Sequence, residues 1–380
     1  MNILFFCNNL NPLSGGVERV TSLLARYFVS HNNLCFYAYC GNDDENIDKS
    51  LKLRYNESED YETFKMKLSD FLSKNRISVI INQDQMQENT AHFIRELKSN
   101  NSILTVNCMH VNPIFYHYSP RYQSIRWKIK NKLHKLYRGY TLPLISRRIM
   151  YYSVDKFVLL SESFFSDFAY EIGVKKKELN AVAIPNPLSF PTETLCINKK
   201  KNQFLIVARF EESQKNLCSA MRIWKSFEEL NDDYELVVAG YGPDLEKVLK
   251  YAESLRIKRM RFVGKALHPE ELYRDAKFFL MTSTYEGFPM TLLESMQYGC
   301  VPIVYDSFSS VHDFITSWEN GVLIKFGNEK KFQRAMVKLV EDLSLQSILA
   351  KNSYEQAQNY TLDKIGNIWV EFINELKNEK

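Results

Sequence analysis

The stretch "KFFLMTSTYEGFPMTLLESMQYGCVPIVY", residues 277–305, contains a strand, a turn, a helix and a second strand. "KFFLMTS" and "VPIVY" are apolar on both faces, which is typical of strands buried in a parallel sheet. Between them, a glycine and a proline precede a helical pattern, and proline suits the first helical turn. Because neighbouring parallel strands are joined by crossover helices, this unit predicts a doubly wound α/β fold.

The same alternation of apolar runs and helical patterns continues along most of the chain, and one segment interrupts it. Residues 185–202 carry three prolines, a basic run and little periodicity, so this segment is predicted to be a linker. We therefore expect two Rossmann-like α/β domains that face a central cleft, an N-terminal one over 1–186 and a C-terminal one over 187–360. An amphipathic helix over 361–380 is expected to pack back on the first domain.

The composition narrows the class of protein. A chain of 380 residues with 45% hydrophobic residues can bury two cores, and a net charge of +4 implies no particular partner. Seven scattered cysteines without a CxxC pair indicate reduced thiols in a cytosol. The start "MNILFFCNNLNP" is expected to be a strand rather than a signal peptide. The sequence contains no run of 18 apolar residues, so no membrane-spanning helix is expected. We expect a cytoplasmic protein.

Glycines and basic residues recur where predicted strands end, which is where such sheets bind ligands. Arg209 ends a strand and Lys215 stands six residues later, so the two could clamp a diphosphate. Either residue alone would also fit a solvated surface charge. Gly16 lies where a loop enters a helix, a place suited to anions, although plain turns use glycine too. Gly240, in a turn after another strand, and Val263, near the end of the next, are candidates for nucleotide binding.

Two acids bracket the turn in the opening stretch. Glu286 lies in the turn, and Glu294 lies two helical turns further on. The loop of Gly287, Phe288, Pro289 and Met290 should aim backbone N–H groups, from about Phe288 to Thr291, at an anion. Glu294 could accept hydrogen bonds from a sugar diol, and Glu286 could face the reacting end of a ligand. The alternative for Glu286 is a surface acid that stabilises the helix start through the dipole.

Taken in order, these motifs resemble the retaining family 4 glycosyltransferases of the GT-B fold. The resemblance rests on "SGGVERV", "IPNPL", "ARFEESQKN", "AGYGPDLEKV", "ENGVLI" and the Glu-x7-Glu arrangement, and is strongest over 203–326. It implies that Arg209 and Lys215 hold the donor diphosphate, with Gly16 beside it. It also implies that Glu294 binds the nucleotide ribose and that Glu286 contacts the donor sugar.

The resemblance includes one histidine, and the sequence departs from the family's pattern at three places. His110, in "TVNCMHVNP", matches the family's active-site histidine, although a satisfied histidine at a strand end would look the same. Ala208 precedes Arg209 where many relatives have glycine, and Pro187 replaces the glycine of "IPNG". "YDSFSSVHDFI" stands where relatives often have Pro-Ser-Gly-Pro, in a region that borders the donor sugar.

No cofactor or metal is expected. Metal-dependent sugar transferases neutralise the leaving diphosphate with an ion held by Asp-x-Asp. The acidic cluster here, Asp43 to Glu45, lies far in sequence from the basic pair and is expected to be a solvated loop. Arg209, Lys215 and the helix amides could neutralise the diphosphate themselves.

A basic segment runs from Arg121 to Arg148, with nine Lys and Arg and no acid. Apolar residues within it fall at helical spacing, so it could lie on an anionic membrane surface. A solvated helix packed on the first domain is the alternative, and nucleic acid is the least favoured partner.

We therefore expect a peripheral membrane enzyme, a retaining glycosyltransferase of hexosyltransferase type in cell-surface polysaccharide or lipopolysaccharide synthesis. UDP-hexose or UDP-N-acetylhexosamine is the preferred donor, with GDP-mannose open, and a lipid-linked saccharide is the expected acceptor. The alternatives are a nucleotide-sugar epimerase or a phosphorylase on the same fold, and a catalytically silent nucleotide-sugar-binding subunit.

Overall fold

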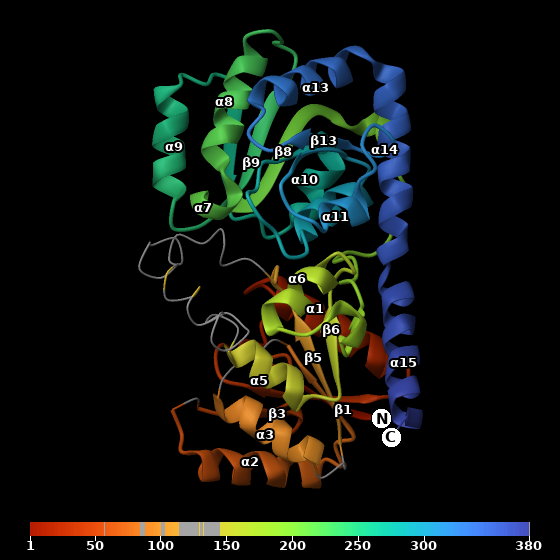
Figure 1. Ribbon diagram of the computed structural model, residues 1–380. Helices are drawn as coiled ribbons and strands as arrows, with labels where there is room; N and C mark the ends of the chain where they lie inside the picture. The colour runs from red at the N-terminus through yellow and green to blue at the C-terminus, as the bar shows by residue number, and fades with distance from the viewer. Residues whose placement is uncertain are drawn as a thin grey trace. The chain divides into compact units, whose positions relative to one another are not determined.

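The computed structural model describes residues 1–56, 58–83, 88–99, 103–113, 129, 132 and 145–379. These residues form two compact units (Figure 1). Unit 1 contains the described residues up to Ser189 together with the C-terminal helix from Leu362, and unit 2 contains those from Phe190 to Thr361. The division after Ser189 falls within the linker that the prolines predict.

Unit 1 is built on a seven-stranded parallel sheet with the order β3-β2-β1-β4-β5-β6-β7. The order reverses between β1 and β4, which creates a topological switch point at their carboxyl ends. The strands are β1 (Asn2–Cys7), β2 (Leu34–Tyr39), β3 (Lys52–Arg54), β4 (Val79–Asn82), β5 (Leu104–Met109), β6 (Lys156–Leu159) and β7 (Ala181–Ala183). The helices are α1 (Gly16–Ser30), α2 (Tyr61–Lys74), α3 (Glu88–Ser99), α5 (Ile145–Ser153), α6 (Phe164–Ile172) and α15 (Leu362–Glu379).

Helices pack on the sheet of unit 1 through apolar side chains that alternate along each strand. Leu4 and Phe6 of β1 join a core with α2 and α3, whereas Phe5 meets Phe28 of α1 at a ring distance of 6.3 Å. The C-terminal helix α15 packs along α1: the Tyr27 hydroxyl donates to Asn367 Oδ1 at 2.6 Å. The last helix of the chain is therefore part of the first unit.

Unit 2 repeats the architecture with six parallel strands in the order β10-β9-β8-β11-β12-β13. The strands are β8 (Lys201–Arg209), β9 (Glu235–Tyr241), β10 (Met260–Gly264), β11 (Ala276–Met281), β12 (Val301–Asp306) and β13 (Val322–Lys325). The helices are α7 (Glu212–Lys215), α8 (Leu217–Glu228), α9 (Leu245–Ser254), α10 (Pro269–Asp275), α11 (Met290–Gln297), α12 (Val311–Phe314), α13 (Glu329–Glu341) and α14 (Leu343–Ala357). The two Rossmann-like units confirm the predicted α/β class.

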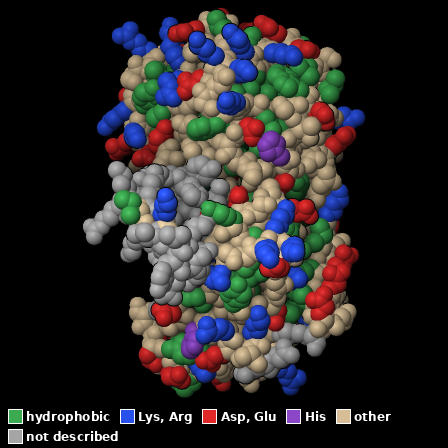
Figure 2. All heavy atoms as spheres, viewed as in Figure 1, with side chains coloured by type: hydrophobic (Ala, Val, Ile, Leu, Met, Phe, Trp, Pro, Cys, Tyr) green, Lys and Arg blue, Asp and Glu red, His purple; other side chains and the backbone are tan. Residues whose placement is uncertain are grey.

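The main core of unit 2 lies where α8, α9 and α13 meet the sheet. Trp224 of α8 is fully buried against Phe204 of β8, with ring centroids 5.7 Å apart. On the face drawn in Figure 2, basic and acidic side chains are interspersed over the surface of this unit. Within the described residues, no helix has the length and apolarity to cross a bilayer.

Candidate active site

The strand order of unit 2 reverses between β8 and β11, and chemistry-bearing side chains gather at this switch point. The carboxyl ends of the two strands, Lys215 and the start of α11 line a narrow pocket there. Its lining residues are Ile206, Val207, Ala208, Lys215, Leu217, Phe279, Leu280, Met281, Thr282, Ser283 and Thr291. Ligands of open α/β sheets bind at such switch points, so this edge of the sheet is the candidate ligand site.

A largely buried ion pair lies beside this pocket. Lys215 Nζ is 2.6 Å from Glu286 Oε1, and the two side chains are 17% and 7% exposed. Ser283 Oγ donates to the same carboxylate oxygen at 2.6 Å, and Gln214 Nε2 donates to Glu286 Oε2 at 3.3 Å. Glu286 is therefore held by three neighbours and is not the exposed helix-start acid that was the alternative interpretation. A desolvated pair of this kind keeps both charges in a fixed geometry.

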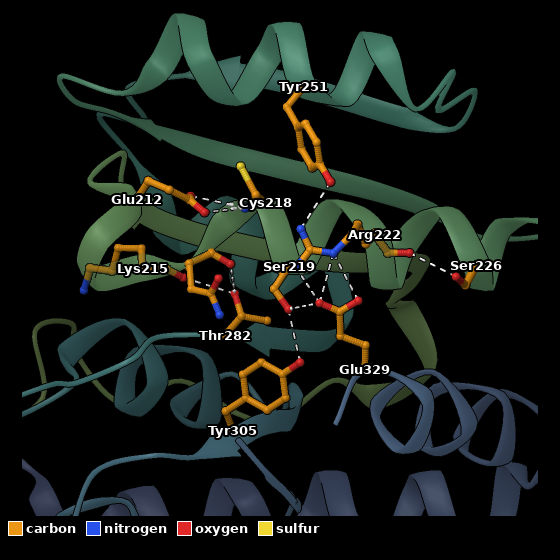
Figure 3. Close-up of polar contacts among 11 residues, drawn as sticks. Glu212, Lys215, Cys218, Ser219, Arg222, Ser226, Tyr251, Thr282, Tyr305 and Glu329 are labelled. Carbon is orange, nitrogen blue, oxygen red and sulfur yellow. Dashed lines mark hydrogen bonds and ion pairs between the residues drawn. The ribbon is translucent and has the colours of Figure 1, made fainter. Parts of the chain in front are cut away.

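The backbone around Lys215 is anchored to the loop after β11. Thr282 Oγ1 donates to the carbonyls of Lys215 and Asn216, at 3.1 Å each (Figure 3). The Thr284 N–H donates to the Gln214 carbonyl at 2.7 Å. Asn216 ends α7 with φ of 50°, a left-handed conformation that asparagine tolerates. These bonds between the two loops hold Lys215 close to Glu286, 71 positions further along the sequence.

A polar network behind the site holds α8 in place (Figure 3). The Glu212 carboxylate accepts the Cys218 N–H at 3.1 and 3.2 Å, which satisfies one donor at the helix start. Arg222 pairs with Glu329 at 2.5 Å, and Ser219 Oγ donates to the same carboxylate at 2.9 Å. This network joins α8 to α13 and keeps the Lys215 loop on a rigid support.

Arg209 occupies a different environment from Lys215. Its side chain is 64% exposed, and its Nε lies 3.8 Å from Glu211 Oε2. The predicted clamp therefore has one buried arm, already paired with Glu286, and one exposed arm at the end of β8. An exposed pair at this distance contributes little to stability, so Arg209 can change its partner at low cost.

The loop before α11 corrects one expectation about anion binding. The Met290 N–H donates to the Phe288 carbonyl at 2.9 Å, and Pro289 has no N–H to offer. The run from Phe288 to Thr291 therefore cannot aim all of its amides at an anion, and only Phe288 and Thr291 remain as donors. Gly287 is fixed through its carbonyl, which accepts from Ser310 Oγ at 2.8 Å.

Glu294 lies on α11 and is 2% exposed. Its Oε2 accepts a hydrogen bond of 2.8 Å from the hydroxyl of Tyr273 on α10. Sequence reasoning did not single out Tyr273, because "ELYRDAK" carries no motif and the contact spans 21 positions.

The two predicted nucleotide-binding positions have structural explanations of their own. Gly240 has φ of 148°, and a Cβ there would lie 1.8 Å from the Ala208 carbonyl oxygen, so close strand packing already requires glycine. Val263 lies at a register shift between β10 and β9. Binding roles for both residues stay predictions.

His110 follows β5 in unit 1, at the same edge of the sheet as the end of β4. Its Nε2 is 2.5 Å from Gln83 Oε1, and burial lowers its pKa to about 4. Nδ1 is buried and has no hydrogen-bond partner among the described residues. The ring is therefore neutral at pH 7, and the contact with the Gln83 oxygen favours the tautomer that carries its proton on Nε2.

Gly16 is the first residue of α1, directly after the cap residue Gly15. Glu18 lies in the same turn: a Cβ on Gly15 would be 2.6 Å from its carboxylate, which also accepts from Asn9 Nδ2 at 3.0 Å. This acid already stabilises the helix start. The role of Gly16 beside a diphosphate stays a prediction.

Unit 1 also has a polar pocket of about 850 Å³ at the carboxyl ends of β1, β2 and β3. Amide, hydroxyl and charged side chains predominate in its lining, which suits a hydroxylated ligand. The lining residues are Asn8, Asn9, Cys40, Gly41, Arg54, Tyr55, Asn56, Ser58 and Glu59. No motif in the sequence marked this pocket, because three separate strand ends supply it.

Two further predictions concern metal and membrane. Within the described ranges, no three His, Cys, Asp or Glu side chains gather as a metal site would require. The cluster at Asp43 is a loop in which that carboxylate pairs with Lys52 at 2.7 Å. Most of the basic segment 121–148 lies outside the described residues.

Solved structures share this architecture over the whole chain. The lipopolysaccharide outer core galactosyltransferase WaaB, in its apo form, matches with a TM-score of 0.70 and 18% identity over 99% of both chains. The Anabaena protein HepE, in complex with UDP and glucose, matches with a TM-score of 0.69 and 13% identity over 99% of this chain and 100% of its own. Two Rossmann-like units of this kind define the GT-B fold.

The sequence comparisons find glycosyltransferases that are similar to part of the chain. Residues 193–356, which include the whole candidate site of unit 2, match the family of glycosyl transferases group 1. That match covers less than half of the chain. The chain is 23% identical to the poly(glycerol-phosphate) alpha-glucosyltransferase of Bacillus subtilis over 228 aligned residues, which are 59% of this chain. It is 26% identical over 235 residues, 61% of this chain, to a Campylobacter jejuni alpha-1,4-N-acetyl-D-galactosaminyltransferase that acts on a diphospho-undecaprenol-linked saccharide. The aligned parts span only 33% and 63% of those two relatives.

Proposed function

We propose that this protein is a retaining glycosyltransferase that moves a hexose or N-acetylhexosamine from a UDP-sugar to a lipid-linked saccharide. Cell-surface polysaccharide or lipopolysaccharide synthesis is the proposed setting. Support for the acceptor class comes from the undecaprenol-linked substrate named for the Campylobacter relative. Support for the donor comes from the UDP and glucose bound by the Anabaena protein of the same fold.

The observation that carries the proposal is the Lys215–Glu286 pair at the switch point between β8 and β11. A nucleotide sugar has an anionic diphosphate next to a neutral hexose with hydroxyl donors. The positive charge of Lys215 suits the diphosphate, and the carboxylate of Glu286 can accept hydrogen bonds from the sugar hydroxyls. Their contact at 2.6 Å places the two groups side by side. Such a pair fits a ligand in which phosphate and sugar are directly bonded.

Transfer then requires the diphosphate to leave with its charge neutralised. The bond between the anomeric carbon and the phosphate oxygen breaks, and the acceptor oxygen bonds to the anomeric carbon from the same face. The acceptor's hydroxyl proton passes to the departing phosphate oxygen. Lys215, Arg209 and the amides of Phe288 and Thr291 stabilise the negative charge that develops on that oxygen. Glu286 orients the sugar and stabilises the positive charge that grows on its ring.

Unit 1 is proposed to bind the acceptor. Its pocket at the ends of β1, β2 and β3 offers amide, hydroxyl and charged groups suited to a saccharide. His110, neutral at pH 7 because burial lowers its pKa to about 4, provides a hydrogen-bonding group without a charge. Peripheral attachment to an anionic membrane through residues 121–148 is proposed from the basic sequence alone.

The test is a transfer assay with UDP-glucose, UDP-galactose, their N-acetylated forms and GDP-mannose, each with a bacterial lipid extract. We expect a lipid-linked saccharide heavier by one hexose or N-acetylhexosamine from one UDP-sugar, detected by mass spectrometry. Conversion of the donor to its epimer without acceptor would favour the epimerase. Donor binding with neither transfer nor hydrolysis for any donor would favour the silent subunit.

A further inference from the structure

A buried hydrogen bond joins α10 to the acid on α11. The Tyr273 hydroxyl donates to Glu294 Oε2 at 2.8 Å. The tyrosine is fully buried and Glu294 is 2% exposed, so little water competes for this bond. The terminal torsion of a glutamate is broad, and a fixed donor on one oxygen restricts it. The phenol therefore limits the orientations that the Glu294 carboxylate can adopt.

Tyr273 is itself held on several sides. Its ring stacks nearly parallel to Tyr298, with centroids 6.2 Å apart, and lies 6.2 Å from Phe279. Its carbonyl accepts from the buried ammonium of Lys200 at 2.9 Å, and the same ammonium donates to the Ala276 carbonyl at 2.7 Å. Burial lowers the pKa of Lys200, and the group is kept at the end of α10 by these carbonyls. The phenol thus projects from a helix end that is fixed by a cation.

The placement of α10 links this bond to nucleotide binding. The helix joins β10, whose end includes Val263, to β11, which ends at the switch point. On the proposed function, the base lies near the end of β10 and the diphosphate lies beside Lys215, so the ribose lies between them. A phenol on α10 that fixes a carboxylate on α11 acts at that intermediate position.

We propose that Tyr273 is a positioning residue for the donor ribose: it holds the Glu294 carboxylate in the orientation that accepts the ribose hydroxyls. This inference rests on the proposed function and adds the residue that makes the nucleotide site discriminate a ribose from a sugar that lacks these hydroxyls. Discrimination follows because a pre-oriented acceptor loses no rotational freedom when the hydroxyls bind.

The test is calorimetry with UDP and with 2′,3′-dideoxyuridine diphosphate, which lacks both ribose hydroxyls. The wild-type protein should bind UDP more tightly than the dideoxy compound. Tyr273→Phe keeps the ring and its packing and removes only the hydroxyl. We expect it to weaken UDP binding by about fivefold to tenfold, the scale of one hydrogen bond, and to leave the dideoxy compound unchanged. KM for the donor should rise in parallel while kcat at saturating donor stays within about twofold, as expected when ground-state binding alone is lost.

Tyr298→Phe is the matched control, because it removes a hydroxyl from the ring stacked on Tyr273 and leaves the bond to Glu294 in place. It should bind both nucleotides as the wild type does. The double variant Tyr273→Phe/Glu294→Gln should discriminate UDP from the dideoxy compound to the same degree as Glu294→Gln alone. The reason is that the phenol acts through the carboxylate, which Glu294→Gln already removes.

Three outcomes would overturn the inference. If Tyr273→Phe weakens both nucleotides equally, the phenol only supports the fold. If the variant binds UDP as tightly as the wild type does, the bond has no effect on the ligand. In both cases the wild type still binds UDP and the proposed function stands. If the wild type binds neither nucleotide, the proposed function fails, and this inference fails with it.

Discussion

The two units carry different chemistry at equivalent edges of their sheets. In unit 2, the switch point presents charged side chains in pairs, with Lys215 against Glu286 and Arg209 near Glu211. In unit 1, the ends of β4 and β5 present Gln83 and a histidine that burial keeps neutral at pH 7. The same fold can therefore offer one edge to an anionic ligand and the other to a hydroxylated, uncharged one. The following predictions test this contrast.

The largest effect is expected from the basic clamp. Lys215→Ala and Arg209→Ala should each lower transfer by roughly a hundredfold, since one lost electrostatic contact to the leaving group costs about 3 kcal/mol. Only Lys215→Ala should also lower the melting temperature clearly, because it leaves the buried Glu286 charge unpaired. Arg209 is 64% exposed, so its loss should hardly change stability.

Steady-state kinetics and thermal unfolding of the two variants measure these effects. Lys201→Ala is the control: it removes a 60% exposed lysine that pairs with Asp275 at the opposite end of β8, and it should retain full activity. Turnover like that of the wild type in either clamp variant would contradict the assignment.

The two acids of unit 2 should separate binding from turnover. Glu294→Gln should weaken the affinity for UDP by at least tenfold, because a charged acceptor of the ribose is lost in ground and transition states alike. Glu286→Gln should barely change UDP affinity and should lower kcat, since its sugar contacts strengthen as positive charge develops on the ring. Calorimetry with UDP and steady-state kinetics distinguish the two. An equal loss of UDP affinity in both variants would refute the division.

The neutral histidine of unit 1 should make stability depend on pH. The folded-state pKa of His110 is about 4, below the ordinary value of 6.5, so the unfolded chain binds more protons between these values. The free energy of unfolding should therefore fall as the pH drops from about 6.5 towards about 4. His110→Gln, which cannot titrate, should lose less stability over that range in urea unfolding. If the wild type and His110→Gln lose the same free energy of unfolding over that pH range, His110 is not buried in its neutral form.

The smallest effect is expected from chelation. Transfer should survive EDTA unchanged, because Lys215, Arg209 and the amides at the start of α11 are proposed to neutralise the leaving diphosphate. An assay with EDTA, followed by addition of manganese, checks this expectation. Activity that disappears with EDTA and returns with manganese would show that a metal shares this task.

The central strands of both units could be predicted from the sequence, whereas three edge strands could not. The predicted strands in "MNILFFCNNLNP", "KFFLMTS" and "VPIVY" correspond to β1, β11 and β12, each of which has a neighbour on both sides in its sheet. The missed strands β3, β7 and β13 have three or four residues each and lie at sheet edges. An edge strand pairs on one side only and has less surface to bury, so its apolar signal is weak.

The residue types of the candidate site in unit 2 could be predicted, but their pairing could not. Lys215 and Glu286 were assigned to different parts of a donor, and their ion pair depends on bonds between the α7 backbone and the loop after β11. Tyr273 and Gln83 lack any motif, and only the folded chain brings them to Glu294 and His110. Sequence patterns indicate which groups lie at a sheet edge, whereas packing decides which of them touch.

The attachment of α15 to α1 has a consequence for how the chain is made. Tyr27 meets Gly366 so closely that a Cβ there would lie 2.4 Å from the ring, and its hydroxyl bonds Asn367. During synthesis from the N-terminus, α1 emerges early, but its partner helix emerges only after all of unit 2. Unit 2 is thus an insertion that can fold while unit 1 is still unfinished. The part of α1 around Tyr27 that contacts α15 stays uncovered throughout that interval, so chaperone binding to nascent chains should concentrate on unit 1.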